Sequence, residues 1–374
     1  RSVFMYINCC FSVYQSHVRY DSTTTLKDKQ TMKAIVVHEF GPPDVMKFEE
    51  IATPEPGEGE VLVRVGAVSV NRGFDVNARA GNSVHGHTLP LIMGVDPSGE
   101  IAAVGSGVDQ SRLNEHVNIR GMARCGSCEG CKQGGRCSLS RPIGIKAPGG
   151  YAEYIVVPDF QARKIPKNIP FADATVVCRH ASAAFSEIYT SQIKEGEWAL
   201  VMGAAGALAS FVVQLAKLKG AHVIAAAGGE DRLEVAKGLG ADHMINYRTQ
   251  DLEQEVRKIT SKRGVDVVFE NIGDPDLWPG AWDSLARNGR LVTVGFHGGG
   301  IVPLDLKKLH MRQLKVLSSA MDAGSKDVQG ECLQLAAEGK IRPLIGIKLP
   351  LKDAAEGHRL VENNEVIGKV ILEP

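Results

Sequence analysis

The sequence predicts an α/β protein that combines a doubly wound parallel sheet with a small antiparallel β-barrel. One apolar run, residues 198–229, has the pattern of a strand, a tight turn, a helix and a second strand. Short β-branched stretches separated by glycine and proline precede it, as in antiparallel barrels. The 374 residues are also long for one hydrophobic core, so two domains are expected.

Residues 198–229 have the order and spacing of a βαβ unit that binds a dinucleotide. Residues 198–202 are apolar, as in a buried parallel strand, and residues 210–219 have helical periodicity. Small residues between them let backbone N–H groups and the positive helix end reach a pyrophosphate. Only the middle glycine of the three-glycine motif, Gly206, is present. The predicted contacts of this turn are Gly203, Ala205, Gly206, Ala207 and Leu208.

The end of the second strand indicates NADP(H) as the dinucleotide. An NAD site places an acidic residue there for the ribose hydroxyl, whereas an NADP site supplies a cation for the 2′-phosphate. This strand ends in Gly228 and Gly229, and Arg232 follows on the next helix. We expect all three to contact the cofactor. Glu230 and Asp231 lie in the same turn and keep NAD as the alternative, in which Arg232 is a solvated helix residue.

Composition excludes several classes of protein. Basic and acidic residues number 43 each and form no basic patch, so no nucleic-acid partner is expected. No apolar run reaches membrane-spanning length, so no membrane association is expected. Four of the eight cysteines cluster within residues 125–137, which indicates metal binding rather than disulfides, and a reducing, cytoplasmic location. We interpret residues 1–31 as a tag or a disordered leader, with a mitochondrial targeting segment as the alternative.

The first domain is expected to begin at Met32. Residues 33–38, 61–70, 100–108 and 151–157 have the composition of short strands. Prolines and glycine at 54–57 mark a turn between the first two of them. Short strands joined in this way favour a small antiparallel barrel.

The most specific motif is the four-cysteine segment Cys125-x2-Cys128-x2-Cys131-x5-Cys137. Four thiolates at such spacings can surround a tetrahedral zinc ion. The surrounding lobe, residues 121–140, contains almost nothing apolar, so burial cannot order it and a metal can. Because all four ligand positions are taken, the predicted zinc is structural, with one ion per chain. Reduced cysteines in a loop are the alternative.

Taken together, these residues resemble the medium-chain dehydrogenase/reductase superfamily, which includes zinc alcohol dehydrogenases and quinone or enone reductases. The resemblance extends from Met32 to Pro374. One departure is the gap before Cys137, which is shorter than is usual in the family. The matching segments are 32–36 (MKAIV), 89–99 (LPLIMGVDPSG), the cysteine lobe, 149–154 (GGYAEY), the turn at 203, 239–242 (LGAD), 264–268 (GVDVV), 289–295 (GRLVTVG) and 368–370 (GKV).

The resemblance implies a GroES-like antiparallel catalytic domain, residues 32–171 and 323–374, with a Rossmann NADP-binding domain, residues 172–322, inserted in it. An edge strand at 314–320 would pair two subunits, which implies a homodimer or a homotetramer. The family places Tyr247 at the adenosine end of the cofactor, and ligands collect at the carboxyl ends of parallel strands. The further predicted cofactor contacts are Tyr247, Asn271, Gly273, Gly295 and Phe296.

The sequence departs from the zinc alcohol dehydrogenases of this family at the catalytic zinc. Those enzymes use a Cys after the second strand, a His in a Gly-His-Glu motif and a later Cys. The matching positions here are Arg72, or Asn71 if the alignment shifts by one, then Val95 and Cys178. One thiolate is too few, because a catalytic zinc needs three protein ligands. We therefore predict no catalytic zinc; the alternative ligands are His85, His87 and His180.

Without that zinc, a substrate easier to reduce than a plain carbonyl is expected. Hydride addition to an enone, quinone or enoyl thioester spreads the charge into an enolate, which hydrogen-bond donors can hold. The resemblance places Ser182 beside the nicotinamide. His180 would donate a proton or bind the oxyanion, or be structural, and Arg72 would bind an anionic substrate group or pair with Asp75. The predicted catalytic residues are Asn71, Arg72, His180 and Ser182.

The leading hypothesis is an NADPH-dependent oxidoreductase that reduces activated C=C bonds of a small molecule without catalytic zinc. One alternative is an alcohol dehydrogenase or carbonyl reductase of the same superfamily. Another is a non-catalytic NADPH-binding protein, like the lens crystallins drawn from this superfamily. The alanines at 204, 207 and 209 bear on the last alternative, because a weakened phosphate turn would accompany lost turnover.

Overall fold

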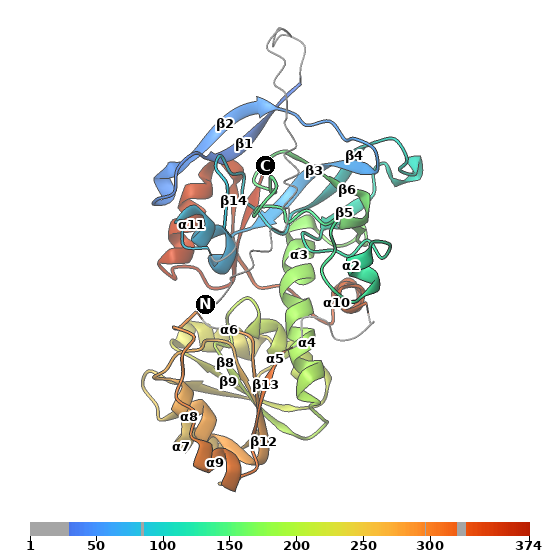
Figure 1. Cartoon of the computed structure of the whole chain (residues 1–374). Helices are drawn as coiled ribbons and strands as arrows, with labels where there is room; N and C mark the ends of the chain where they lie inside the picture. Colours follow the sequence, from blue (N-terminus) through green and yellow to red (C-terminus); the bar gives the residue numbers. More distant parts are fainter. Residues whose placement is uncertain (1–29, 84–85, 296, 320–326) are drawn as a thin grey trace, which may run out of the picture.

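The computed structural model describes residues 30–83, 86–295, 297–319 and 327–374, so the interpretation of the leader lies outside the described residues, save for its last two. The chain forms two bodies, one above the other in Figure 1, each built on its own sheet. No helix in the described ranges is both long enough and apolar enough to cross a membrane.

The lower body contains a six-stranded sheet in which every pair of neighbours is parallel. The spatial order is β10-β9-β8-β11-β12-β13, so the chain reverses its direction of travel across the sheet between β8 and β11. This is the Rossmann order predicted from the sequence, and a cofactor binds at that reversal point in such folds. The strands are β8 (Trp198–Met202), β9 (His222–Ala227), β10 (His243–Asn246), β11 (Val265–Glu270), β12 (Leu285–Thr293) and β13 (Lys315–Ser318).

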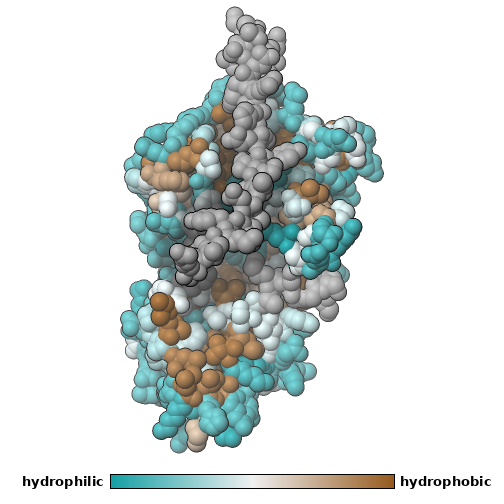
Figure 2. Space-filling model, viewed as in Figure 1, coloured by the Kyte–Doolittle hydropathy of each residue, from teal (hydrophilic) through white to brown (hydrophobic). Residues whose placement is uncertain are grey.

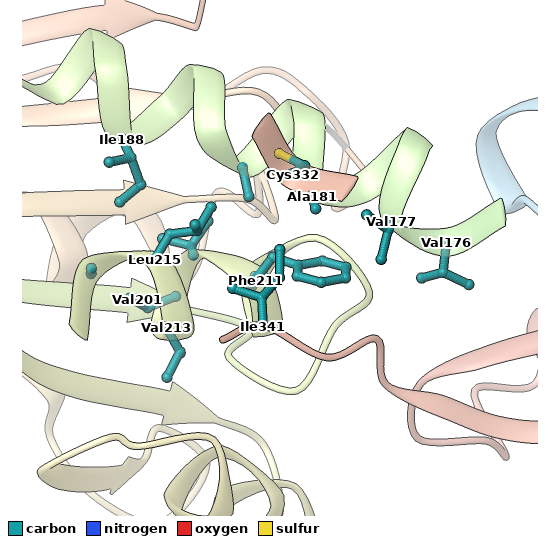
Figure 3. Close-up of a cluster of buried hydrophobic side chains, with 14 of the residues drawn as sticks. Val176, Val177, Ala181, Ile188, Val201, Phe211, Val213, Leu215, Cys332 and Ile341 are labelled. Carbon is teal, nitrogen blue, oxygen red and sulfur yellow. The ribbon is translucent and has the colours of Figure 1, made fainter. Parts of the chain in front are cut away.

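Helices cover both faces of this sheet because alternate strand residues point to opposite sides. Ala199 and Val201 of β8 join one buried cluster, and Leu200 and Met202 join the other. Figure 3 shows the first cluster, in which Phe211 lies below the helical segment that carries Ala181 and Val177. The helices are α4 (Ser182–Ser191), α5 (Ala209–Leu218), α6 (Glu230–Gly238), α7 (Leu252–Ile259), α8 (Trp278–Asp283) and α9 (Leu306–Met311).

The upper body is built from both ends of the chain. Its seven-stranded sheet has the order β14-β15-β3-β4-β5-β7, with β6 on the other edge of β3. Most neighbours are antiparallel as predicted, but β14 and β15 run parallel to each other, which the sequence did not indicate. The strands are β3 (Glu60–Ser69), β4 (Ser98–Val104), β5 (His116–Ile119), β6 (Tyr154–Pro158), β7 (Ala162–Lys164), β14 (Ile345–Pro350) and β15 (Lys369–Glu373).

A separate hairpin, β1 (Thr31–Val37) with β2 (Met46–Ala52), packs at the far end of the upper body. The strand β2 was not predicted, because apolar and charged residues alternate over only its first four positions. The shorter helices of this body are α1 (Asn77–Arg79), α2 (Glu129–Lys132) and α11 (Ala354–Glu362), and α10 (Val328–Ala337) packs against the junction described next.

One continuous helical rod joins the two bodies (Figure 1). It consists of α3 (Phe171–Val176), a π-helical turn (Val177–Ala181) and α4. A π-turn inserts one extra residue into a helix, and such turns are frequent at functional sites. This one carries Cys178, Arg179 and His180 to the place where the two bodies meet.

Candidate active site

A buried polar network lies where β3 ends, at the position predicted for zinc-free catalysis. Asn71 follows β3, and its Nδ2 donates to Asp96 Oδ2 (3.0 Å) and Asp75 Oδ2 (3.1 Å). Ser69 donates to Asp96 through both its backbone N (3.0 Å) and its Oγ (2.6 Å). Gly94 N donates to Asp75 Oδ1 at 3.0 Å. All of the side chains in this network are almost completely buried.

A buried lysine completes this network. Lys369, at the start of β15, donates through Nζ to Val70 O (2.6 Å) and Asn71 Oδ1 (2.9 Å). Burial lowers the pKa of Lys369 to about 8, although Asp96 opposes that change. Burial and the neighbouring Asp96 raise the pKa of Asp75 to about 6. The positive charge of Lys369 and the hydrogen bonds of Asn71 therefore compensate two carboxylates that have no access to bulk water.

The π-turn places three side chains above this network. Cys178 is buried, and burial raises its pKa far above the ordinary value. The guanidinium of Arg179 lies over the ring of Phe74, 4.4 Å from its centre. Its Nε is 3.9 Å from Asp96 Oδ2, which is too long for a hydrogen bond. Burial, with Lys369 and Arg179 adding to it, lowers the pKa of His180 well below its ordinary value, so this imidazole is neutral.

The four predicted catalytic residues lie in different surroundings. Asn71 is the centre of the buried network, and His180 Nε2 is buried without a hydrogen-bond partner in the described structure. Ser182 begins α4, and its hydroxyl lies beside the thiol of Cys332. Arg72 turns away from Asp75 and donates instead to the end of α11, at Val361 O and Asn364 Oδ1 (2.8 Å). The alternative pairing of Arg72 with Asp75 is therefore wrong.

The sequence did not identify Arg179 and Lys369 as site residues. The signal for Lys369 was present, because residues 368–370 formed one of the family segments. The sequence could not show that Arg179 rather than Arg72 lies at the site, because this depends on the backbone geometry of the π-turn, which no sequence periodicity predicts. Of the alternative zinc ligands, His87 Nδ1 lies 3.0 Å from Ile145 O, and His85 lies outside the described residues.

The turn between β8 and α5 has the predicted form of a phosphate-binding loop. Gly203 has φ of 63°, a left-handed conformation that favours glycine, and it accepts a hydrogen bond from Gly206 N (2.7 Å). Ala204 and Ala205 are buried beneath the turn, whereas Gly206 is exposed at its tip. Ala207 and Leu208 lead into α5, which begins at Ala209. The tight turn therefore uses Gly203, one residue before the first position of the glycine motif.

Two arginines and a tyrosine gather at the carboxyl end of β9. A Cβ atom on Gly228 would lie 2.9 Å from Arg248 Nε and 3.2 Å from Tyr247 Oη. Burial raises the pKa of Tyr247, and the positive charges of Arg248 and Arg232 oppose that rise. Arg232 Nη2 donates across the domain junction to Asn364 O (3.1 Å). Arg248 is a further residue that the sequence analysis did not identify.

The two acidic residues that kept NAD as an alternative have local partners. Glu230 Oε1 accepts from Asn246 Nδ2 at 2.7 Å. Asp231 Oδ1 accepts from the backbone N of Arg232 at 2.8 Å, beside the extended Gly229. A carboxylate held by such bonds can still accept a hydrogen bond from a ribose hydroxyl. The charged group nearest Gly228, however, is the guanidinium of Arg248.

The carboxyl ends of β11 and β12 form the other wall of the cleft. A Cβ on Gly295 would lie 2.0 Å from Asn271 O, so only glycine fits there. Gly273, with φ of 69°, donates its backbone N–H to Glu270 Oε2 at 2.9 Å. Asn271 Nδ2 points to the buried Glu187 on α4, at 3.3 Å from Oε2. Phe296 lies outside the described residues.

The four cysteines of the lobe lie together as a possible metal centre. Their sulfurs all fall within 4.8 Å of one another. Cys125 Sγ is 3.9 Å from Cys131 Sγ, and Cys128 Sγ is 3.8 Å from Cys137 Sγ. A tetrahedral zinc with bonds of about 2.3 Å requires sulfur separations of about 3.8 Å, so these residues fit zinc. Met122, at 62 % exposure, and Leu139 give the lobe no core of its own.

Comparison with known proteins identifies both bodies. Residues 57–167 match the family described as "Alcohol dehydrogenase GroES-like domain". Residues 207–338 match the family described as "Zinc-binding dehydrogenase". The chain is 32 % identical over 349 residues to an NAD-dependent alcohol dehydrogenase of Sulfolobus acidocaldarius, with 91 % of this chain and 99 % of the relative covered.

Two further proteins are similar to the chain over nearly its whole length. The chain is 29 % identical over 362 residues to a 2-haloacrylate reductase of a Burkholderia species, covering 91 % of this chain and 98 % of that protein. Among solved structures, that of AibC is 34 % identical and superposes with a TM-score of 0.83 over 93 % of this chain and 97 % of the other.

Proposed function

This chain belongs to the medium-chain dehydrogenase/reductase superfamily of NAD(P)H oxidoreductases, and from that premise we propose that it reduces activated C=C bonds with NADPH and without catalytic zinc. One observation carries the proposal. At the position of the catalytic zinc, the Asn71 amide donates to two carboxylates and accepts from Lys369, while Val95 offers no ligand atom. Cys178 alone cannot hold a catalytic ion.

This arrangement suits conjugate reduction rather than carbonyl reduction. NADPH, when bound, supplies the hydride. Reduction of a plain carbonyl concentrates charge on one oxygen, whereas addition to the β-carbon of an enone, quinone or enoyl thioester spreads it. Arg179 and the N–H of the neutral His180 are donors that can hold a delocalised enolate oxygen. Because His180 is neutral, water or another group supplies the proton to the α-carbon.

NADPH is proposed over NADH on the charges around Gly228. Arg232 and Arg248 supply two guanidinium groups that can bind a 2′-phosphate through paired hydrogen bonds. Tyr247 lies beside Gly228, where its ring can cover the adenosine. NAD-dependence of the Sulfolobus relative makes NADH the alternative.

The lobe would hold one structural zinc ion through Cys125, Cys128, Cys131 and Cys137. Backbone N of Cys128 donates to Cys125 Sγ at 3.3 Å, and Ser127 Oγ lies 3.4 Å from the same sulfur. Such donors stabilise thiolates, the form that binds zinc. With four sulfurs in place this ion has no open position for a substrate, so it would order the lobe.

A homodimer is proposed on the free edge of the parallel sheet. Among the described residues β13 pairs with β12 alone, and apolar side chains are exposed on and before it. Figure 2 shows this apolar surface on the lower body. An exposed strand edge with apolar neighbours is a surface for pairing with another chain. The exposed residues are Ile301 (87 %), Leu304, Leu306, Met311 and Val316.

The names of the relatives keep an alcohol dehydrogenase as the second candidate, and a non-catalytic NADPH-binding protein as the third. The test follows the loss of NADPH absorbance with an α,β-unsaturated ketone and, separately, with its saturated counterpart. We expect only the enone to be consumed, with the saturated ketone as the product. Formation of an alcohol from the saturated ketone would favour the second candidate, and cofactor binding without turnover on either would favour the third.

A further inference from the structure

We propose that Arg179 binds a carboxylate on the substrate, so that this protein reduces C=C bonds in molecules that carry a carboxylate beside the reducible bond. The inference rests on the proposed function, because it names the substrate class of the same site. It depends on the ring that stacks on the Arg179 guanidinium, on the hydrogen bonds that this guanidinium does not make among the described residues, and on the other partners of the carboxylates near it.

Arg179 is held in place by ring stacking rather than by a hydrogen bond to a carboxylate. Its guanidinium lies over the face of Phe74, 4.4 Å from the ring centre, which is a cation–π contact. A guanidinium stacked in this way keeps its N–H donors in its own plane, away from the ring. Phe74 belongs to the π-turn that follows Asn71, Arg72–Val76, so both partners are fixed by the same end of the cleft.

The donors of Arg179 are not used by the protein. The nearest carboxylate, Asp96, is 3.9 Å away, and among the described residues Arg179 makes no hydrogen bond. Asp96 is already occupied, because it accepts from Ser69 N, Ser69 Oγ and Asn71 Nδ2. The side chain of Arg179 keeps 26 % of its surface exposed, whereas that of Asp96 keeps 5 %. A planar cation with five donors and partial access to solvent is suited to bidentate binding of a carboxylate.

The two carboxylates nearest Arg179 already have other hydrogen-bond partners. Asp75 accepts from Asn71 and from Gly94 N. Asp96 accepts from Ser69 and Asn71. The guanidinium of Arg179 therefore keeps donors that a substrate anion can use.

The segment around Cys178, which matches a catalytic zinc-ligand position of the family, connects Arg179 with the reaction. Arg179 follows Cys178 directly and lies three residues before Ser182, so in the chain it falls between the residue that matches a zinc ligand of the family and the residue predicted to lie beside the nicotinamide. Hydride from NADPH adds to the β-carbon, and the electrons of the C=C bond move to the α-carbon and its conjugated oxygen. The α-carbon then takes one proton, which gives NADP⁺ and the saturated acid. A guanidinium on the carboxylate both orients the substrate and offsets the added negative charge.

The test uses one pair of substrates, 4-oxopent-2-enoate and its methyl ester. The ester is intrinsically the better hydride acceptor, so a preference for the acid must come from the protein. For the wild-type protein we expect a higher kcat/KM with the acid than with the ester. In R179Q, kcat/KM for the acid should fall about 10- to 150-fold, the effect of losing hydrogen bonds to a charged group, while that for the ester changes little. R179K should recover part of the loss. The control, R64Q, removes a surface arginine that pairs with Glu100 and should leave both values unchanged.

The outcomes separate the two proposals. An acid-to-ester ratio of kcat/KM that is the same in R179Q as in the wild-type protein would overturn the role of Arg179 and leave conjugate reduction standing. Reduction of neither substrate, with NADPH bound, would overturn conjugate reduction itself. Levulinate, the saturated product, gives a second readout, because it should inhibit the wild-type protein more strongly than R179Q.

Discussion

Replacing Glu187 by Gln should stabilise this protein, and by more as the pH rises. Glu187 lies on α4 with its side chain fully buried. Asn271 Nδ2 donates to Glu187 Oε2, but Glu187 Oε1 and Asn271 Oδ1 have no hydrogen-bond partner in the described structure. A proton on Glu187 Oε1 turns this atom from an acceptor into a donor. It can then donate to Asn271 Oδ1, which otherwise has no donor.

The magnitude follows from proton linkage. Burial raises the pKa of Glu187 well above its ordinary value of 4.5, and nearby Glu270 adds to this rise while the bond from Asn271 opposes it. The folded state therefore holds this proton more tightly than the unfolded state. Its stabilising contribution is complete below the unfolded pKa and is lost as pH rises through the folded pKa. In that window the free energy of unfolding falls by up to about 1.4 kcal/mol per pH unit.

Thermal melting from pH 5 to pH 8 measures this effect. Gln is neutral and close to Glu in shape, so the Tm of E187Q should exceed that of the wild type by a margin growing about 3–6 °C per pH unit within the window. The control is E234Q, because the Glu234 side chain is 75 % exposed and should give no such trend. A margin that stays the same at pH 5 and pH 8 would refute the reasoning, since it would mean that folding does not change the protonation of Glu187.

Three further predictions concern the zinc lobe, the cofactor and the cleft wall. C137S should lower the zinc content from one ion per chain to none, and limited proteolysis should then cut within residues 121–140 first; an unchanged metal content would contradict the ligand set. R248Q should raise KM for NADPH about 10- to 150-fold and leave KM for NADH nearly unchanged, and equal effects on both would remove Arg248 from the 2′-phosphate site. G295A should lower the free energy of unfolding by about 1–3 kcal/mol, because its Cβ would meet Asn271 O; denaturant unfolding measures this, and a stability equal to wild type would show that the strands can separate there.

The parallel sheet could be predicted because its signals are local. The continuous apolar run of β8 and the helical periodicity of α5 follow from residues close in the chain, so both elements begin and end within a residue or two of the prediction. The cysteine lobe is local as well, and its four sulfurs lie together as the spacing indicated. In contrast, β2 and the parallel pairing of β14 with β15 depend on partners chosen in the folded chain.

The site was less predictable because its contacts join distant segments. Asn71 and Lys369 are 298 positions apart, and Arg72 reaches Val361 across a similar separation. Arg248 comes to Gly228 only because β10 pairs with β9 in one register, in which Asn246 lies beside Ala227. A sequence identifies the residue types that chemistry requires, but two arginines such as Arg72 and Arg179 differ only in the direction that the backbone gives them.

The network around Asn71 also predicts that replacing ligands alone would not create a catalytic zinc site. Asn71→Cys with Val95→His would supply three ligands together with Cys178. The same change removes the amide that donates to Asp75 and Asp96 and accepts from Lys369. These three charged groups would then be buried with fewer partners, and losing partners of this kind typically costs several kcal/mol. A design that introduces zinc here should therefore change position 369 together with the ligands, because Lys369 donates to Asn71 Oδ1.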